Sequence, residues 1–312
     1  MFSIHTFDDF CLWMYVMIDD WYQQVHAQFH RPGPAPTTGS DSEVLTMVLV
    51  GECCGWHAET ELTRQWAQRT DLFPHQPSLS RFNRRRRDLA GGLQGLHQFV
   101  LGQLSWADDR LLLLDSVPMA VVSRARGRRG SSDWRVHHAD YGYARTKRLP
   151  FFGYSLHVLA TCGGVILDWV LTSPKTADVT AAEDLLHQTA IPLEGRMVLA
   201  DKGYTSAGLR QSVWLGRGVR LLVLPKRRTR AALMLPLLTR QRFARLRQRI
   251  ETLNSQLTEQ FGVEQTRAHS FVGMVARLRA KLTAHLCCVF ANWVSGGSLD
   301  QALHVKHWVT AP

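Results

Sequence analysis

The sequence contains few cysteines, no low-complexity tract and no apolar run long enough to span a bilayer. An apolar stretch at residues 10–18 lies between pairs of aspartates and has no basic leader, which argues against a signal peptide. The six cysteines show no C-x-x-C spacing, so we expect reduced thiols packed in a core and no zinc site. These absences predict a soluble, cytoplasmic protein without a membrane partner.

Acidic side chains are the minority among the charged residues. The chain has 26 Asp and Glu against 37 Lys and Arg, a formal net charge of +11. Such an excess predicts a polyanionic partner, nucleic acid first, and the basic residues are mostly arginines, which suit bidentate phosphate contacts. An arginine-rich composition also arises in GC-rich genomes, so the charge alone does not identify the partner. With 312 residues, 45% of them hydrophobic, the chain is long enough for a large core.

Residues 1–105 predict a helical region that ends in a strongly basic segment. Serines at 78 and 80 are suitable caps for a helix over residues 78–89, in which four consecutive arginines occupy positions 84–87. Four neighbouring positions fan around a helix, so some of these side chains must face away from the core. The pattern is typical of a helix-turn-helix recognition helix, and the alternative is a solvated charged helix. The candidate DNA-binding residues here are Arg81, Arg84, Arg85 and Arg86.

Two short apolar runs each end in an aspartate. Residues 111–114 are four leucines followed by Asp115, and residues 197–200 are followed by Asp201, Lys202 and Gly203. Both runs predict buried strands with a carboxylate where the strand leaves the sheet. A single aspartate at a strand end is commonly a turn cap, but a pair suggests a divalent cation.

The segment 116–150 predicts a basic loop in which aromatic residues alternate with arginines. Basic groups hold phosphates and aromatic faces stack on unpaired bases, although a charged loop is often only solvated. Because the loop follows Asp115 directly, we favour DNA binding. The candidates in it are Arg128, Arg129, Arg145 and Lys147.

The order of elements predicts the catalytic fold. Strands at 151–162 and 165–172 form a hairpin. After the hairpin come a helix, the strand ending at Asp201, a further helix, a strand at 219–224 and a long helix at 239–261. We therefore expect an α/β ribonuclease-H-like domain over 106–295, with a mixed five-stranded sheet and flanking helices, preceded by the all-α region and followed by a tail, 296–312. In that sheet the first and fourth strands are neighbours. Asp115 and Asp201 would then converge, with Glu251 supplied from the long helix.

Three convergent carboxylates repel one another unless a cation lies between them. Two Mg²⁺ ions would neutralise them and clamp a phosphodiester, one activating the attacking oxygen and the other stabilising the leaving oxygen. Oxygen ligands favour Mg²⁺, or Mn²⁺ as a substitute, over zinc. The predicted metal ligands and catalytic residues are Asp115, Asp201 and Glu251.

Several motifs resemble those of one known family. They are residues 77–85 (PSLSRFNRR), 115–118 (DSVP), 141–143 (YGY), 152–157 (FGYSLH), 200–204 (ADKGY), 249–251 (RIE) with 255–257 (SQL), 267–268 (RA) and 277–281 (RLRAK). In this order, over nearly the whole chain, they resemble the DDE transposases of bacterial insertion sequences, most closely the insertion-sequence 982 family. Two departures are Ser155, where lysine is usual, and Val117, where an aromatic residue is common.

The resemblance implies a nucleoid-associated bacterial enzyme that binds double-stranded DNA. It would cut at the terminal inverted repeats of its own element and join the freed 3′-hydroxyl to target DNA. Asp115, Asp201 and Glu251 match the catalytic triad of the family, and synapsis of two ends implies a homo-oligomer, as small as a dimer. The alternatives are a ribonuclease-H-like nuclease without strand transfer and a non-catalytic, transposase-derived repressor.

Some residue assignments keep alternatives. Glu251 occupies the Arg-Ile-Glu position of the family, but Glu259 and Glu264 lie further along, and Glu251 could simply pair with Arg247. Lys202, Tyr204 and Arg249 are weaker candidates for DNA contacts, with packing or surface roles as the alternative. The spacing of His137, His138 and His157 fits no standard metal-binding motif.

Overall fold

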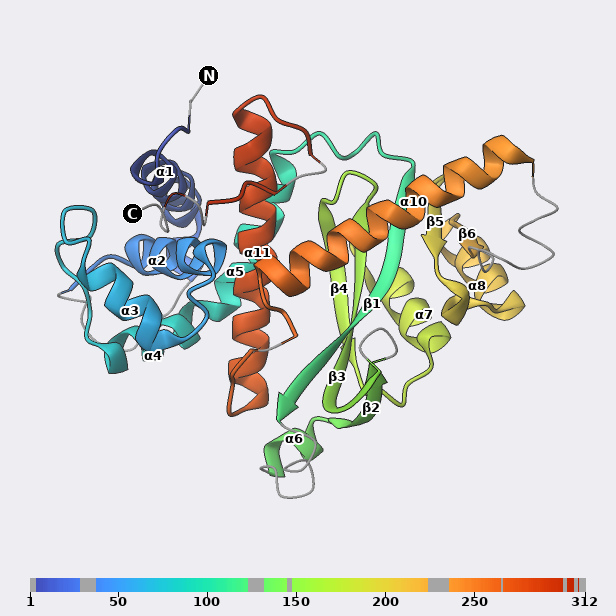
Figure 1. Ribbon diagram of the computed structural model, residues 1–312, viewed down its shortest axis with the longest axis horizontal. Coiled ribbons are helices and arrows are strands. Elements are labelled where there is room, and N and C mark those ends of the chain that lie inside the picture. Colours follow the sequence, from blue (N-terminus) through green and yellow to red (C-terminus); the bar gives the residue numbers. More distant parts are fainter. Residues whose placement is uncertain are drawn as a thin grey trace. The chain divides into compact units, whose positions relative to one another are not determined.

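The chain forms two compact units in the computed structural model, which describes residues 4–28, 38–122, 132–144, 148–223, 236–264, 266–299, 302–305 and 308 (Figure 1). One unit combines residues 1–104 with 256–312, and the other is residues 105–255. The second unit begins at residue 105, and the sequence placed the start of the catalytic domain at 106. Residues after 255 group with the N-terminal helices, whereas the sequence placed residues up to 295 in the catalytic domain. No described helix is both long and apolar enough to cross a membrane.

The first unit is built from helices in its described residues. Thr6 and Ser40 begin α1 and α2 with capping boxes: each side chain accepts a hydrogen bond from the backbone of Asp9 or Glu43, whose own carboxylate accepts one from the backbone of the cap. The C-terminal helix α11 packs on α2 and α5 of the same unit. The helices are α1 (Phe7–Val25), α2 (Asp41–Cys54), α3 (Glu59–Ala67), α4 (Leu79–Asp88), α5 (Gly92–Gly102) and α11 (Phe271–Val294), with the short turns η1 (His26–Gln28), η2 (Leu89–Gly91) and η5 (Gln256–Gln260).

A group of buried charges joins these helices. Glu52 on α2 is 1% exposed, and its carboxylate accepts hydrogen bonds from Arg86 Nη2 at 2.7 Å and Lys281 Nζ at 2.8 Å. His57 Nδ1 lies 2.7 Å from the same carboxylate. The neighbouring cations hold the pKa of Glu52 far below its usual range although burial opposes this. The ionic core therefore links three helices that are distant in the sequence.

The second unit holds one mixed sheet with helices against it (Figure 1). Its strands are β1 (Leu111–Val122), β2 (Asp140–Ala144), β3 (Leu149–Thr161), β4 (Ile166–Thr172), β5 (Met197–Ala200) and β6 (Arg220–Val223). Its helices are α6 (Ser132–Val136), α7 (Asp178–Gln188), the turn η4 (Lys202–Tyr204), α8 (Ala207–Arg217) and α10 (Leu237–Ser255).

The sheet has the predicted topology with one strand more. The antiparallel pairs β1–β3 and β3–β4 continue into the parallel pairs β1–β5 and β5–β6, so the first and fourth predicted strands are neighbours. The described sheet has six strands because β2 pairs with the first part of β3, over residues predicted as loop. The strand β2 is five residues long, and its sequence, DYGYA, contains no apolar run that would predict a strand.

Strand β1 is longer than the sequence suggested. It continues past Asp115 to Val122, and β3 pairs with it along this length, including Pro118 opposite Ser155. Proline lacks the N–H that a central strand needs, but β5 pairs with β1 only as far as Leu114. No hydrogen bond between β1 and β5 is therefore lost at Pro118. Asp115 lies within β1, at the level where β5 ends.

The two faces of the sheet alternate along β1 and β5. Leu113 and Leu199 pack against Ile250 of α10, which crosses the sheet in Figure 1. Leu114 and Val198 point to the opposite face and are fully buried. With this period of two, Asp115 and Asp201 belong to the face that α10 covers.

Candidate active site

Two aspartates stand side by side where β5 ends. The parallel register pairs Leu114 with Ala200, and Asp115 and Asp201 are the next residues of the two chains. The sequence prediction that these two residues converge agrees with this register. The site therefore lies at the carboxyl end of β5, on the face covered by α10.

The carboxylate of Asp115 is held by two hydrogen bonds. Its Oδ1 accepts from the backbone N–H of Ser116 at 2.8 Å, and its Oδ2 accepts from Asn254 Nδ2 on α10 at 2.6 Å. Burial raises the pKa of Asp115 to about 6; the two hydrogen bonds lower it, and the negative charges of Asp201 and Asp178 raise it again. Asp115 is thus a fixed carboxylate in a region of concentrated negative charge.

Asp201 is exposed and ends β5 with a tight turn. Its Oδ1 accepts from the backbone N–H of Gly203 at 2.6 Å, which caps η4. A Cβ at Gly203 would lie 2.3 Å from Asp178 Oδ2 and 2.9 Å from Asp201 Oδ1. Glycine at this position lets two carboxylates approach the same point.

Glu251 is exposed on α10, one helical turn before Asn254. Among the described residues, no three His, Cys, Asp or Glu side chains are grouped so that they could hold a metal ion together. The structure therefore brings Asp115 and Asp201 together, while Glu251 lies one turn from the residue that contacts Asp115. The alternatives Glu259 and Glu264 belong to the other unit.

Sequence reasoning missed Asn254 and Asp178. Asn254 could have been found as the residue one turn beyond Glu251 on the same helix face. Asp178 had a weaker signal, as the first residue of a helix that follows the hairpin.

Tyr204 is buried beside the aspartates. Its side chain is 1% exposed, and its hydroxyl lies 2.9 Å from His157 Nδ1, while His157 Nε2 lies 3.1 Å from Thr172 Oγ1. The structure packs this side chain inside the sheet domain, which is the alternative that the sequence left open for Tyr204. Lys202 is exposed next to Asp201, and its contact with DNA stays a prediction.

The buried His157 predicts a pH-dependent stability. Burial lowers its pKa to about 4, below the value near 6.5 expected in the unfolded chain. Between these two pKa values the unfolded chain binds a proton at His157 more readily than the folded chain does. Acidification from about pH 6.5 to 4 therefore lowers the free energy of unfolding by up to about 3 kcal/mol. Chemical denaturation across this range should show a smaller loss in His157→Gln than in the wild type. His137→Gln, at a partly exposed position, should retain the wild-type loss; equal losses in all three proteins would contradict the prediction.

The arginines of α4 divide into two sets. Arg85 and Arg86 are 6% and 5% exposed, and they bind Asp41 and Glu52 in ion pairs of 2.6 and 2.7 Å. Two of the four predicted DNA contacts on α4 therefore lie in buried ion pairs of the helical core. Arg81 and Arg84 are exposed and lie one turn apart on the outer face of the helix.

The other predicted DNA contacts are only partly covered by the structure. Arg249 is exposed on α10. The basic-loop candidates, Arg128, Arg129, Arg145 and Lys147, lie outside the described residues.

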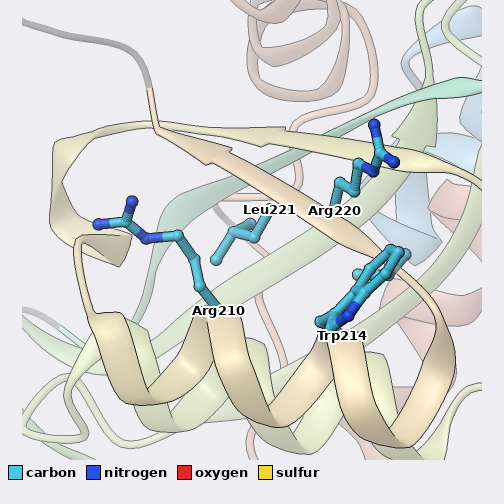
Figure 2. A pocket seen from close by; sticks show the side chains of 5 residues that line it. Arg210, Trp214, Arg220 and Leu221 are labelled. Atoms are coloured by element: carbon cyan, nitrogen blue, oxygen red, sulfur yellow. The ribbon is translucent and has the colours of Figure 1, made fainter.

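A separate hollow lies between α8 and β6. Figure 2 shows Trp214 and Arg220 at one end of it and Arg210 at the other, with Leu221 between them. The Arg220 guanidinium lies 5.4 Å from the ring centre of Trp214. Because Arg220 pairs with Met197 at the start of β5, the hollow begins at the opposite end of that strand from Asp201.

Comparison with known proteins gives one match. A family model described as a transposase DDE domain matches residues 106–287. No curated protein and no solved structure matches the chain. The matched segment starts just before β1 and contains both aspartates, Asn254 and Glu251.

Proposed function

The chain belongs to the DDE transposase family, and on this premise we propose that it is the transposase of a bacterial insertion sequence, most similar to the insertion-sequence 982 family. It would cleave DNA at the terminal inverted repeats of its element and join the 3′-hydroxyl to target DNA. The observation that carries the proposal is the register of β1 and β5, which sets Asp115 beside Asp201 inside the matched domain.

The acidic pair fits a hard divalent cation. Burial, and after it the negative charges of Asp201 and Asp178, raise the pKa of Asp115. Carboxylate oxygens are the donors that Mg²⁺ and Mn²⁺ prefer. We propose that Asp115 and Asp201, with Glu251 from α10, hold two Mg²⁺ ions. When bound, such ions activate the attacking oxygen and stabilise the leaving oxygen of a phosphodiester.

The protein's own groups would fix the geometry of this site. Asn254 and the backbone of Ser116 each hold one oxygen of Asp115, so the carboxylate cannot turn freely. Gly203 fixes Asp201 in the same way through its backbone N–H. Preorganised ligands of this kind align a phosphodiester without reorganisation during the reaction. Lys202, exposed beside Asp201, is placed to contact a phosphate.

Binding of double-stranded DNA is proposed for both units. In the first, the exposed arginines Arg81 and Arg84 of α4 replace the four-residue set predicted from sequence. In the second, Arg249 and Lys202 are exposed. A homodimer on the DNA remains part of the proposal because two element ends must be held together for joining.

Neutralising the outer face of α4 should weaken DNA binding. Arg81→Ala and Arg84→Ala are each expected to reduce affinity for duplex DNA and to lower the slope of log affinity against log salt by about 1. Fluorescence anisotropy with a labelled duplex at several salt concentrations measures both quantities. The matched control is Arg64→Ala, which removes an exposed arginine of the same unit that is already paired with Glu61. Equal slopes in all four proteins would remove α4 from the DNA interface.

The function itself is tested with labelled element-end DNA, Mg²⁺ and a target plasmid. Joined products would support a transposase. Nicked ends without joining would indicate a nuclease, and shifted but intact DNA would indicate a repressor. Either of the last two results would overturn the proposed strand transfer.

A further inference from the structure

A third aspartate reaches the acidic pair from a different element. Asp178 is the first residue of α7, and its Oδ2 lies 2.3 Å from the position that a Cβ on Gly203 would occupy. Asp201 Oδ1 lies 2.9 Å from the same position. Two carboxylates thus converge on a space that only glycine leaves open. This space adjoins the end of β5, where Asp115 stands in the neighbouring strand.

The carboxylates of Asp178 and Asp201 lie close together, because both have an oxygen within 3 Å of the position of a Cβ on Gly203, at 2.3 and 2.9 Å. Like charges this close repel one another and cost folding free energy, and a divalent cation offsets that cost. The placement is therefore unfavourable for the isolated chain and favourable for a chain that binds a cation.

Support of α7 is the structural alternative for Asp178. An acidic residue in the first turn of a helix interacts well with the helix dipole. The residue before it, Ala177, makes no side-chain cap, and Asp178 is the acidic residue of the first turn. The two roles predict opposite signs when the charge is removed from the metal-free protein.

We propose that Asp178 is a further acidic residue of the catalytic centre, which binds the divalent cation together with Asp115 and Asp201. This inference rests on the proposed metal-dependent function and deepens it. The described residues do not form a closed group of three ligands, so binding requires side-chain rotation at Asp178 or Asp201. Asp201 is exposed and Asp178 is partly exposed. Gly203 has a defined part in this arrangement, because any side chain there would fill the space between the two carboxylates.

The test compares Asp178→Asn with Asp184→Asn in the full-length protein. Asp184 is exposed on the same helix and serves as the matched control. Calorimetric titration with Mn²⁺ should show affinity at least about tenfold weaker in Asp178→Asn and unchanged in Asp184→Asn. Thermal unfolding in EDTA should give a higher melting temperature for Asp178→Asn than for the wild type, and a smaller increase on adding Mg²⁺. Asp178→Ser, a second uncharged polar replacement in the first turn of α7, repeats both measurements if the Asn variant does not fold.

Two results would overturn the inference. One is wild-type Mn²⁺ affinity in both Asp178 variants, and the other is a lower melting temperature in EDTA with an unchanged increase on adding Mg²⁺. Asp115→Asn separates this failure from failure of the proposed function. If Asp115→Asn loses Mn²⁺ binding and the Asp178 variants do not, only the role of Asp178 is rejected. If no variant weakens Mn²⁺ binding, the metal site itself is rejected.

Discussion

Replacing Asp115 by asparagine is expected to lower the rate of metal-dependent strand cleavage by at least about 1000-fold. The substitution keeps the size of the side chain and removes its negative charge. Asp115 directly follows the segment of β1 that pairs with β5. Its effects on stability oppose each other. The repulsion from Asp201 and Asp178 is relieved, and one of the two hydrogen bonds from Ser116 and Asn254 is lost because an amide has one acceptor oxygen. The variant should therefore remain folded and be inactive.

The measurement is cleavage of labelled element-end DNA in Mg²⁺, with circular dichroism to confirm folding. Asp168→Asn is the control, since Asp168 lies on β4 of the same sheet and pairs with Leu159. It should retain cleavage within a few-fold of the wild type. Full cleavage by Asp115→Asn would end the assignment of this residue as a metal ligand, whatever the outcome at Glu251.

Replacing Glu52 by glutamine is expected to destabilise the helical unit by about 3–5 kcal/mol. Glu52 is 1% exposed and its carboxylate meets Arg86, Lys281 and His57. Glutamine would leave Arg86 and Lys281 buried without a counter-charge. The free-energy cost of these unpaired cations exceeds what their ion pairs with Glu52 contribute to stability. Because two units unfold in one chain, the loss should appear as a lower melting temperature for one transition, by about 10 °C.

The ion group also sets a direction for acid denaturation. The pKa of Glu52 is lowered in the folded state, so its contribution is present above the unfolded value near 4.5 and is lost as pH falls below it. The control is Glu61→Gln, at a partly exposed glutamate paired with Arg64, which should leave the stability close to that of the wild type. If Glu52→Gln unfolds like Glu61→Gln, the charges are not coupled as the distances indicate.

The part of the fold that sequence reasoning predicted depends on short, unambiguous signals. The four leucines before Asp115 and the apolar run before Asp201 are short and end at a charged residue, which indicates buried strands. Their order relative to the hairpin predicts that β1 lies beside β5. That step alone brought the two aspartates together, although they are far apart in the sequence. The match to the transposase DDE domain supports the resemblance to DDE transposases, while the insertion-sequence 982 family stays a prediction.

What the sequence could not predict depends on partners elsewhere in the chain. Arg85 and Arg86 resemble their exposed neighbours in every local property, and only Asp41 and Glu52 turn them inward. Tyr204 follows a charged turn, and its burial depends on His157 in another strand. The grouping of α11 with the N-terminal helices had no local signal either, since a buried helix fits any core.

The position of Lys281 bears on how the protein is synthesised. During translation the N-terminal helices leave the ribosome first, yet Glu52 cannot meet Lys281 until 229 further residues have been made. The sheet domain, by contrast, is a continuous stretch, 105–255, and is complete before the last helix emerges. A nascent chain therefore carries a finished catalytic sheet before its helical unit has its full ionic core.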